Sequence, residues 1–321
     1  MCYIGNLGRT TFKSVSRGGL EWLECGALTR LPWLLHAFST RHGGVSKGAA
    51  RGLNLGFIEA DSRANVEKNR RRFFSQLGEQ NWTLASLRQI HSTHIYRVVR
   101  KTREEPEYHP AGYPAPAGRG RRAPEGDALM TDQPGILLPV RVADCLPILL
   151  ADPRRRAVAA VHAGWRGTLA RIVQKTVGVM RQVFGTDPQG LRAAVGPGIR
   201  ACCYEVSEDV VGAFCGRFSR GESYFRDLPP RNPTDALAEK YPLLFLSKQP
   251  PGHLEDRLPA AHLDLVAATE DQLLEAGLRA ANIHVAEFCT ACRTDLFFSH
   301  RKEGARTGRM MAVIGIRPDK S

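Results

Sequence analysis

Hydrophobic residues in this chain gather in short runs that predict buried strands, interleaved with a few amphipathic helices. The strand-like runs are rich in Val, Ile, Leu and Ala and stop at Gly, Pro or Asp. They cover residues 31–39, 95–99, 135–143, 146–151, 157–162, 191–195, 283–288 and 310–316. Apolar positions spaced three and four apart predict helices over 61–77, 168–184, 205–218 and 263–276. Because several strands are joined by turns too short to hold a helix, the pattern predicts an α/β or α+β fold with mixed β-sheets flanked by helices.

Three segments break this pattern. Residues 1–20 are polar and contain Gly and Ser, which predicts a flexible N-terminal arm. Residues 101–126 are rich in Pro, Gly, Ala and charged side chains, with almost nothing to bury, and are expected to form an exposed loop. Residues 219–260 are proline-rich and weakly patterned. Residues 21–321 are expected to form a single domain that contains the exposed loop.

The charge of the chain is strongly positive, with a formal net charge of +13. The arginines are scattered in short runs without a basic helix or an aromatic-rich motif, so we expect no nucleic-acid partner. The N-terminus lacks the apolar stretch of a signal peptide, and no apolar run reaches membrane-spanning length. The eight cysteines are irregularly spaced in a chain too long to need a disulfide scaffold. These features predict a cytoplasmic protein with reduced thiols and no membrane partner, and we expect a monomer.

Three residues carry candidate chemistry: His91 in the phrase RQIHSTH, Cys145 in VADCLP and His162 in AVHAGWRG. Imidazole and thiolate are the ligands that zinc prefers, and three of them leave a fourth position open, as in catalytic zinc sites. The same residue types supply the nucleophile and base of a cysteine hydrolase. A cysteine in a strand is also commonly a small core residue. The residues by themselves leave these alternatives open.

Two further cysteine pairs stand outside these phrases. Cys289 and Cys292 form a CxxC pair, and Cys202 and Cys203 are adjacent. Either pair could bind a metal or take part in redox chemistry. A single CxxC pair lacks two of the four ligands of a structural zinc site, so packing is the expected role of both pairs.

The chain also carries a series of longer motifs. In order, they are LPWLLHAFSTRHGGVS (31–46), LNLG (53–56), VEKNRRR (66–72), RQIHSTHIYRV (88–98), GDALMTD (126–132), VADCLPILLADP (142–153), AAVHAGWRGT (159–168), AVGPGIRACCYEV (194–206), HLDL (262–265) and FCT followed by FFSHRKEGARTGRMMAVIGI (288–316). With these motifs the sequence resembles the bacterial family known as multicopper polyphenol oxidase or laccase-like, peptidoglycan editing factor (YfiH-type), and purine nucleoside phosphorylase. It departs from that family at His300, where a Tyr is common, and in the length and basic character of residues 101–126.

This resemblance implies a fold, a metal and an activity. It implies a mixed α/β fold related to toxin-type cysteine deamidases, with His91, Cys145 and His162 as catalytic residues and zinc ligands. The implied activity is phosphorolysis of adenosine, inosine, guanosine and methylthioadenosine, with adenosine deamination beside it. Copper is the alternative metal. A copper-dependent polyphenol oxidase is the weaker alternative function, because the ten histidines include no HxH pair.

Phosphate and nucleoside require cationic or hydroxyl partners. Arg41 and Ser46, at the two ends of a Gly-Gly loop, are candidates, as are Arg70 in an Asn-Arg run and Arg166 beside a helix start. Asp144, next to the candidate thiol ligand, is a candidate for orienting a histidine or stabilising charge on the ribose.

Two other classes of function stay open. In a metal-free amide hydrolase that edits cell-wall precursors, Cys145 would be the nucleophile and His162 the base. A non-enzymatic zinc-binding or partner-binding protein would use the same three ligands without turnover.

Overall fold

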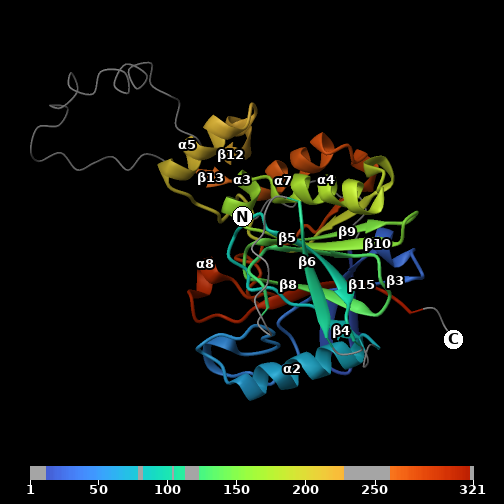
Figure 1. Ribbon diagram of the computed structural model, residues 1–321. Coiled ribbons are helices and arrows are strands. Elements are labelled where there is room, and N and C mark those ends of the chain that lie inside the picture. Colours follow the sequence, from blue (N-terminus) through green and yellow to red (C-terminus); the bar gives the residue numbers. More distant parts are fainter. Residues whose placement is uncertain (1–11, 79–81, 103–104, 113–122, 228–260, 319–321) are drawn as a thin grey trace, which may run out of the picture.

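Two β-sheets lie face to face between two layers of helices (Figure 1). This arrangement is seen in a computed structural model that describes residues 12–78, 82–102, 105–112, 123–227 and 261–318. Within these residues one sheet has six strands, the other has seven, and a short third sheet has two. The fold is therefore the mixed α/β architecture that the hydrophobic pattern predicts. No helix within the same ranges has the length and apolar character needed to cross a membrane.

The six-stranded sheet forms one inner layer. Its strands, in spatial order, are β1 (Phe12–Arg17), β2 (Leu20–Cys25), β3 (Leu34–Ser39), β15 (Met310–Ile316), β8 (Ile136–Val142) and β4 (Thr83–Leu84). Neighbouring strands are antiparallel except for β4 and β8. Helix α2 (Arg63–Gln76) covers the outer face, with Phe73 edge-on to Trp22 at 6.4 Å between ring centroids. Ser62 caps the N-terminus of this helix, because its side chain accepts from the Asn65 N–H.

The seven-stranded sheet forms the other inner layer. Its strands, in spatial order, are β14 (Ile283–Val285), β11 (Arg192–Val195), β9 (Leu146–Asp152), β10 (Ala157–Ala163), β7 (Ala128–Thr131), β5 (Ile95–Arg100) and β6 (Pro106–Ala111). Helices α4 (Ile172–Phe184) and α7 (Leu265–Glu275) cover its outer face (Figure 1). The sheet is mixed, since β11–β14 and β5–β7 pair in parallel and the other pairs are antiparallel.

Strand β10 shows why the strand runs are apolar at nearly every position. Successive side chains of a strand point to opposite faces. Val158 and Ala160 pack between the two sheets, whereas Ala159 and Val161 pack under the helices. A strand covered on both faces needs apolar side chains throughout, and each large one that is fully buried stabilises the fold by roughly 1.5–3 kcal/mol.

The remaining described elements are short. They are α1 (Gly26–Thr29), α3 (Trp165–Leu169), α5 (Glu208–Arg217), α8 (His300–Glu303), β12 (Phe225–Arg226), β13 (His262–Leu263) and the 3-10 helices η1 (Gly48–Ala50), η2 (Pro188–Gly190), η3 (Gly221–Tyr224) and η5 (Ala280–Asn282).

The helix predicted over 168–184 differs from the structure. It begins earlier, as α3, and breaks before α4 because Arg171 has a φ of 61°, in the left-handed region. Arg171 is held there by tertiary contacts: its guanidinium donates to Glu275 at 2.5 Å and stacks over Phe218 at 4.6 Å. Contacts distant in sequence thus override a continuous helical pattern.

Two segments without predicted elements contain strands. Phe12–Arg17, inside the segment expected to be a flexible arm, is β1 and pairs antiparallel with β2. Pro106–Ala111, inside the expected loop 101–126, is β6 at an edge of the seven-stranded sheet, where proline is tolerated. Its Tyr108 hydroxyl accepts from the Ser86 N–H at 2.8 Å, which anchors the strand. Residues 1–11, 113–122 and 228–260, which include most of the proline-rich stretch, lie outside the described residues.

His36 on β3 makes stability depend on pH. Its side chain is buried, its Nε2 accepts from the Cys25 N–H at 2.8 Å, and burial lowers its pKa to about 4. Between pH 6.5 and pH 4, His36 therefore binds a proton in the unfolded chain but not in the folded protein. We expect this residue to lower the free energy of unfolding by about 2–3 kcal/mol between pH 7 and pH 4.5.

Urea unfolding of the protein and of His36→Gln at both pH values tests this expectation. Glutamine can accept the same N–H but does not titrate. The pH-dependent loss should shrink by that amount in the variant, and an equal loss in both proteins would contradict the assignment.

Candidate metal centre

Three strand ends bring His91, Cys145 and His162 together. His162 is near the end of β10, Cys145 directly precedes the antiparallel neighbour β9, and His91 lies in the loop before β5. One ligand atom from each residue lies within 4.8 Å of the others. The Cys145 Sγ is 3.7 Å from the His91 Nε2, and the two imidazole centroids are 4.9 Å apart. The structure thus gathers the three candidate ligands that the sequence places far apart.

A buried carboxylate, Asp127, holds both histidines. It precedes β7 and is fully buried. Its Oδ1 accepts from the His162 Nδ1 at 2.8 Å and from the His91 N–H at 3.1 Å. Its Oδ2 accepts from the N–H and hydroxyl of Ser92 at 2.5 and 2.8 Å, and from the Ile90 N–H at 3.3 Å. The loop therefore wraps around one carboxylate, which holds His91 at a left-handed φ of 58°.

These contacts set the protonation of the centre. Burial opposes a charge on Cys145, but the neighbouring imidazoles, His162 first, lower its pKa to about 6. Burial also opposes a charge on His162, but Cys145 and Asp127 raise its pKa to about 9. Without a metal, the site therefore holds a thiolate beside an imidazolium. A divalent cation can take the place of the proton between them.

Gly164 lets the backbone approach the ligands closely. A Cβ at this position would lie 2.8 Å from the Cys145 Sγ and 2.9 Å from the His91 Cδ2. On the other side, His91 is exposed and Cys145 is half-buried, while His162 is only 4% exposed. The centre is thus closed on the backbone side and open on the side of His91 and Cys145.

The carboxylate of Asp144 bonds to other partners than a histidine, which corrects the first of the two roles predicted for it, while stabilising charge on the ribose stays a prediction. Its carboxylate accepts from the Thr290 hydroxyl and from the Arg301 N–H, both at 2.6 Å. Its φ of 87° lies in the left-handed region, and its side chain is bonded to these C-terminal loops. Asp127 makes the contact to His162 instead. Asp127, in the motif GDALMTD, therefore orients the histidine. Nothing in its spacing distinguishes it from an ordinary aspartate before a strand.

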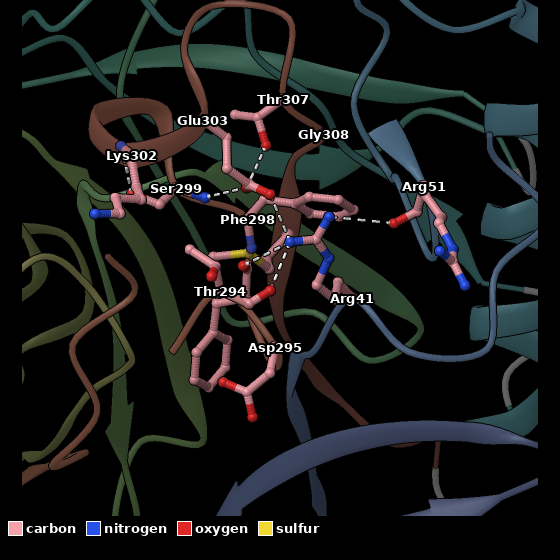
Figure 2. A network of polar contacts seen from close by, with 12 residues as sticks. Arg41, Arg51, Thr294, Asp295, Phe298, Ser299, Lys302, Glu303, Thr307 and Gly308 are labelled. Atoms are coloured by element: carbon pink, nitrogen blue, oxygen red, sulfur yellow. Dashed lines mark hydrogen bonds and ion pairs between the residues drawn. The ribbon is translucent and has the colours of Figure 1, made fainter. Parts of the chain in front are cut away.

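Arg41 lies in a polar network with the C-terminal loops (Figure 2). Its Nη1 donates to the Thr294 carbonyl at 2.6 Å and to the Glu303 carboxylate at 2.8 Å. Its Nη2 donates to the Arg51 carbonyl at 3.4 Å, and the guanidinium stacks over Phe298 at 4.4 Å. These contacts occupy Nη1 and one hydrogen of Nη2, and the predicted phosphate role stays a prediction.

Arg41→Ala is expected to lower the free energy of unfolding by about 2–3 kcal/mol. The Glu303 carboxylate, whose side chain is only 26% exposed, would be left without its cationic partner. Arg41→Lys should recover only part of this loss, since a lysine cannot serve several acceptors as a planar fork does. Urea unfolding measures both effects. Unchanged stability with a raised KM for phosphate in Arg41→Lys would instead favour the phosphate role.

The other candidate substrate residues lie in different places. Ser46 donates to the Asp61 carboxylate, just before α2, at 2.5 Å, and Arg70, on α2 itself, donates to the Leu55 carbonyl at 2.8 and 2.9 Å. Arg166 is exposed in α3, over the ring of the preceding tryptophan at 4.3 Å. Only Arg166 follows directly on the strand that carries His162. Their roles toward substrate stay predictions.

Two residues near the thiol carry no sequence signal of their own. Burial lowers the pKa of Arg309, and the negative charges of Cys145 and Asp144 act against this shift. Its Nη1 donates to the carbonyls of the two preceding residues. Burial raises the pKa of Tyr204, and the charge of Cys145 adds to this effect. Both residues lie within long motifs, where nothing in the spacing distinguishes them.

The donor set suits a transition metal. One thiolate and two imidazoles converge. The His162 ring donates its Nδ1–H to a carboxylate, which leaves Nε2 as the nitrogen that can coordinate a metal ion. Carboxylate–histidine pairs of this kind orient zinc ligands in many proteins. The residues present therefore fit a metal ion.

The sequence also matches a known family over most of its length. A family model described as multi-copper polyphenol oxidoreductase laccase matches residues 35–317. The chain belongs to this family. The predicted resemblance to the laccase-like, YfiH-type proteins is thereby confirmed.

Members of this laccase-like family with assigned names resemble the chain closely. It is 34% identical over 313 residues to purine nucleoside phosphorylase YlmD of Geobacillus stearothermophilus, covering 96% of this chain and 98% of that protein. It is 34% identical over 283 residues to adenosine deaminase RL5 of an unknown prokaryotic organism, covering 87% of this chain and 93% of that protein. The crystal structure of YlmD from Geobacillus stearothermophilus aligns with a TM-score of 0.74 and 33% identity, covering 96% of this chain and 100% of that chain.

Proposed function

We propose that this protein is a zinc-dependent purine nucleoside phosphorylase with adenosine deaminase activity beside it. One observation carries the proposal: a thiol and two imidazoles converge on one point, with one imidazole bonded to a buried carboxylate. The names of the relatives support the reaction class. Adenosine, inosine, guanosine and methylthioadenosine, each with phosphate, are the proposed substrates.

Zinc is the proposed metal, although the family model is named for copper. The His162–Asp127 pair is typical of zinc sites, and the exposed side of His91 leaves room for an open coordination position. When bound, zinc supplies a Lewis acid at that open position. A copper-dependent polyphenol oxidase is the weaker alternative, and metal analysis distinguishes the two.

The residues of the chain would share the work as follows. Asp127 holds the His162 imidazole and the backbone of His91 in position, and it keeps the proton on the His162 Nδ1. In phosphorolysis a phosphate oxygen bonds to the anomeric carbon while the purine leaves with the electrons of the glycosidic bond. Arg309 and the exposed Arg166 are the nearby cations proposed to hold the phosphate. Tyr204, half-buried beside the thiol, is proposed to contact the nucleoside.

Product analysis of purified protein given adenosine, with and without phosphate, tests the proposal. Adenine and ribose-1-phosphate should form only with phosphate, and Cys145→Ala should form neither. Cys215→Ala is the matched control, since Cys215 lies on α5, apart from the His91–Cys145–His162 centre and from the two cysteine pairs. Inosine alone would make the protein chiefly a deaminase. No product from protein with a filled metal site would contradict a nucleoside substrate.

A second candidate is a metal-free amide hydrolase acting on cell-wall precursors. The observation that favours it is the depressed pKa of Cys145 beside a histidine that is itself bonded to an aspartate, as in a catalytic triad. The relation of the fold to the toxin-type cysteine deamidases stays a prediction. It predicts activity that is lost on alkylation, survives chelation and releases no ribose-1-phosphate. A cytoplasmic location and a monomeric state stay predictions under either function.

A further inference from the structure

The two cysteine pairs that the sequence leaves apart meet at one edge of the seven-stranded sheet. Cys202–Cys203 follows β11, and Cys289–Cys292 follows its parallel neighbour β14. Parallel strands deliver the loops that follow them to the same edge. The pairing continues past the strands, with a bridge between Gly198 and Cys289 and a bond from the Thr290 N–H to the Gly198 carbonyl at 3.1 Å. Topology therefore supplies the two ligands that a single CxxC pair lacks.

The four sulfurs have the spacing of a tetrahedral site. All four lie within 4.8 Å of one another. The Cys292 Sγ is 3.5 Å from the Cys202 Sγ and 3.3 Å from the Cys203 Sγ. Sulfurs held about 2.3 Å from a zinc ion at the corners of a tetrahedron are about 3.8 Å apart. One metal ion fits among them with small side-chain movements.

The surroundings of the Cys289 sulfur suit a thiolate. The backbone N–H groups of Arg200, Ala291 and Cys292 donate to the sulfur of Cys289, which is buried. The positive charge of the Arg200 guanidinium interacts with the charges of Cys289 and Cys202, and the guanidinium donates to the Ala286 carbonyl. Four thiolates around a divalent cation carry a net charge of about −2, which such donors stabilise.

We propose that Cys202, Cys203, Cys289 and Cys292 bind a second zinc ion. Four protein ligands leave no open position, so this zinc is structural rather than catalytic. Packing alone, the role expected from the sequence, does not account for four thiols with their sulfurs turned toward one point. The other described cysteines outside the catalytic centre, Cys25 and Cys215, belong to no such group.

The second zinc would also support the catalytic centre. Thr290 lies inside the CxxC turn, and its hydroxyl donates to Asp144, the neighbour of Cys145. Fixing the turn therefore fixes the backbone beside the thiol ligand. This effect is a positioning one, and the proposal does not depend on the reaction catalysed.

Metal analysis of the full chain, purified under reducing conditions, tests the proposal. We expect two zinc ions per chain. The double variant Cys289→Ser/Cys292→Ser should retain one, His91→Ala/His162→Ala should retain the other, and Cys215→Ser should retain both. When Co²⁺ replaces zinc, the sulfur-to-cobalt absorption lost in the cysteine double variant should exceed that lost in the histidine variant, since four thiolates contribute instead of one.

If the double variant does not fold, the unmodified protein is titrated with an organomercurial instead. The reagent should release the second zinc as the four thiols of this site react. One zinc per chain that disappears in His91→Ala/His162→Ala would overturn the proposal, as would iron in place of zinc or a disulfide between the two cysteine pairs. Because the readout is metal content, a failure here is distinct from failure of the phosphorylase proposal.

Discussion

Asp127→Asn is expected to weaken metal binding by the His91–Cys145–His162 centre about 10–100-fold, with a parallel loss of activity. The carboxylate accepts five hydrogen bonds, from His162, from Ser92 twice, and from the backbone of residues 90 and 91. An asparagine offers one acceptor oxygen and turns two donor hydrogens toward these donors. Each buried donor left without a partner costs about 1–3 kcal/mol, so the loop is expected to shift and carry His91 with it.

The measurement is zinc affinity by competition with a chelator, beside thermal unfolding. Asp132→Asn is the matched control, because Asp132 lies just beyond the other end of β7 and pairs with Arg97 at a half-exposed site. The control should keep its affinity for zinc. Equal affinities in Asp127→Asn and the unaltered protein would show that the carboxylate does not hold the ligands.

Gly164→Ala is expected to displace ligands of the same centre while the fold remains. The added methyl would lie 2.8 Å from the Cys145 Sγ and 2.9 Å from the His91 Cδ2, closer than real Cβ contacts. The φ of −83° suits alanine, so the effect is steric and local, without backbone strain. We expect zinc affinity to fall at least about tenfold, as when ligand geometry is disturbed.

Gly178→Ala in α4 is the control for a glycine-to-alanine change. A Cβ there meets nothing within 4 Å, and the residue is exposed. It should stabilise the helix by roughly 0.5–1 kcal/mol and leave zinc affinity unchanged. Titration of both variants with zinc, together with circular dichroism, separates displaced ligands from unfolding. Normal zinc affinity in Gly164→Ala would mean that the ligands can move aside without loss.

The elements predicted best are those covered on both faces. The strands β8, β9, β10 and β15 are apolar at nearly every position because a sheet or a helix covers each face, so a local pattern reveals them. Strand β6 was not predicted, since it lies at an edge, carries two prolines and depends on partners across the sheet. The break at Arg171 was not predicted either, because its contacts come from residues distant in sequence.

Some residues of the candidate site can likewise be predicted from the sequence, and others cannot. His91, Cys145 and His162 stand in phrases that mark them as ligand types, and the structure brings them together. Asp127 is separated from its partner His162 by 35 residues and reads locally as an aspartate before a strand. The meeting of the two cysteine pairs depends on the parallel pairing of β11 with β14, which no spacing along the chain indicates.

The position of β15 bears on how the protein is made. This strand comes after every other described strand in the sequence, yet it lies in the interior of its sheet, between β3 and β8. Until residues 310–316 emerge from the ribosome, both neighbours present unpaired backbone groups along apolar strands, a surface open to aggregation. A nascent chain would therefore depend on protection until β15 has been made. For the same reason, premature termination before β15 would remove the middle of a sheet instead of trimming its edge.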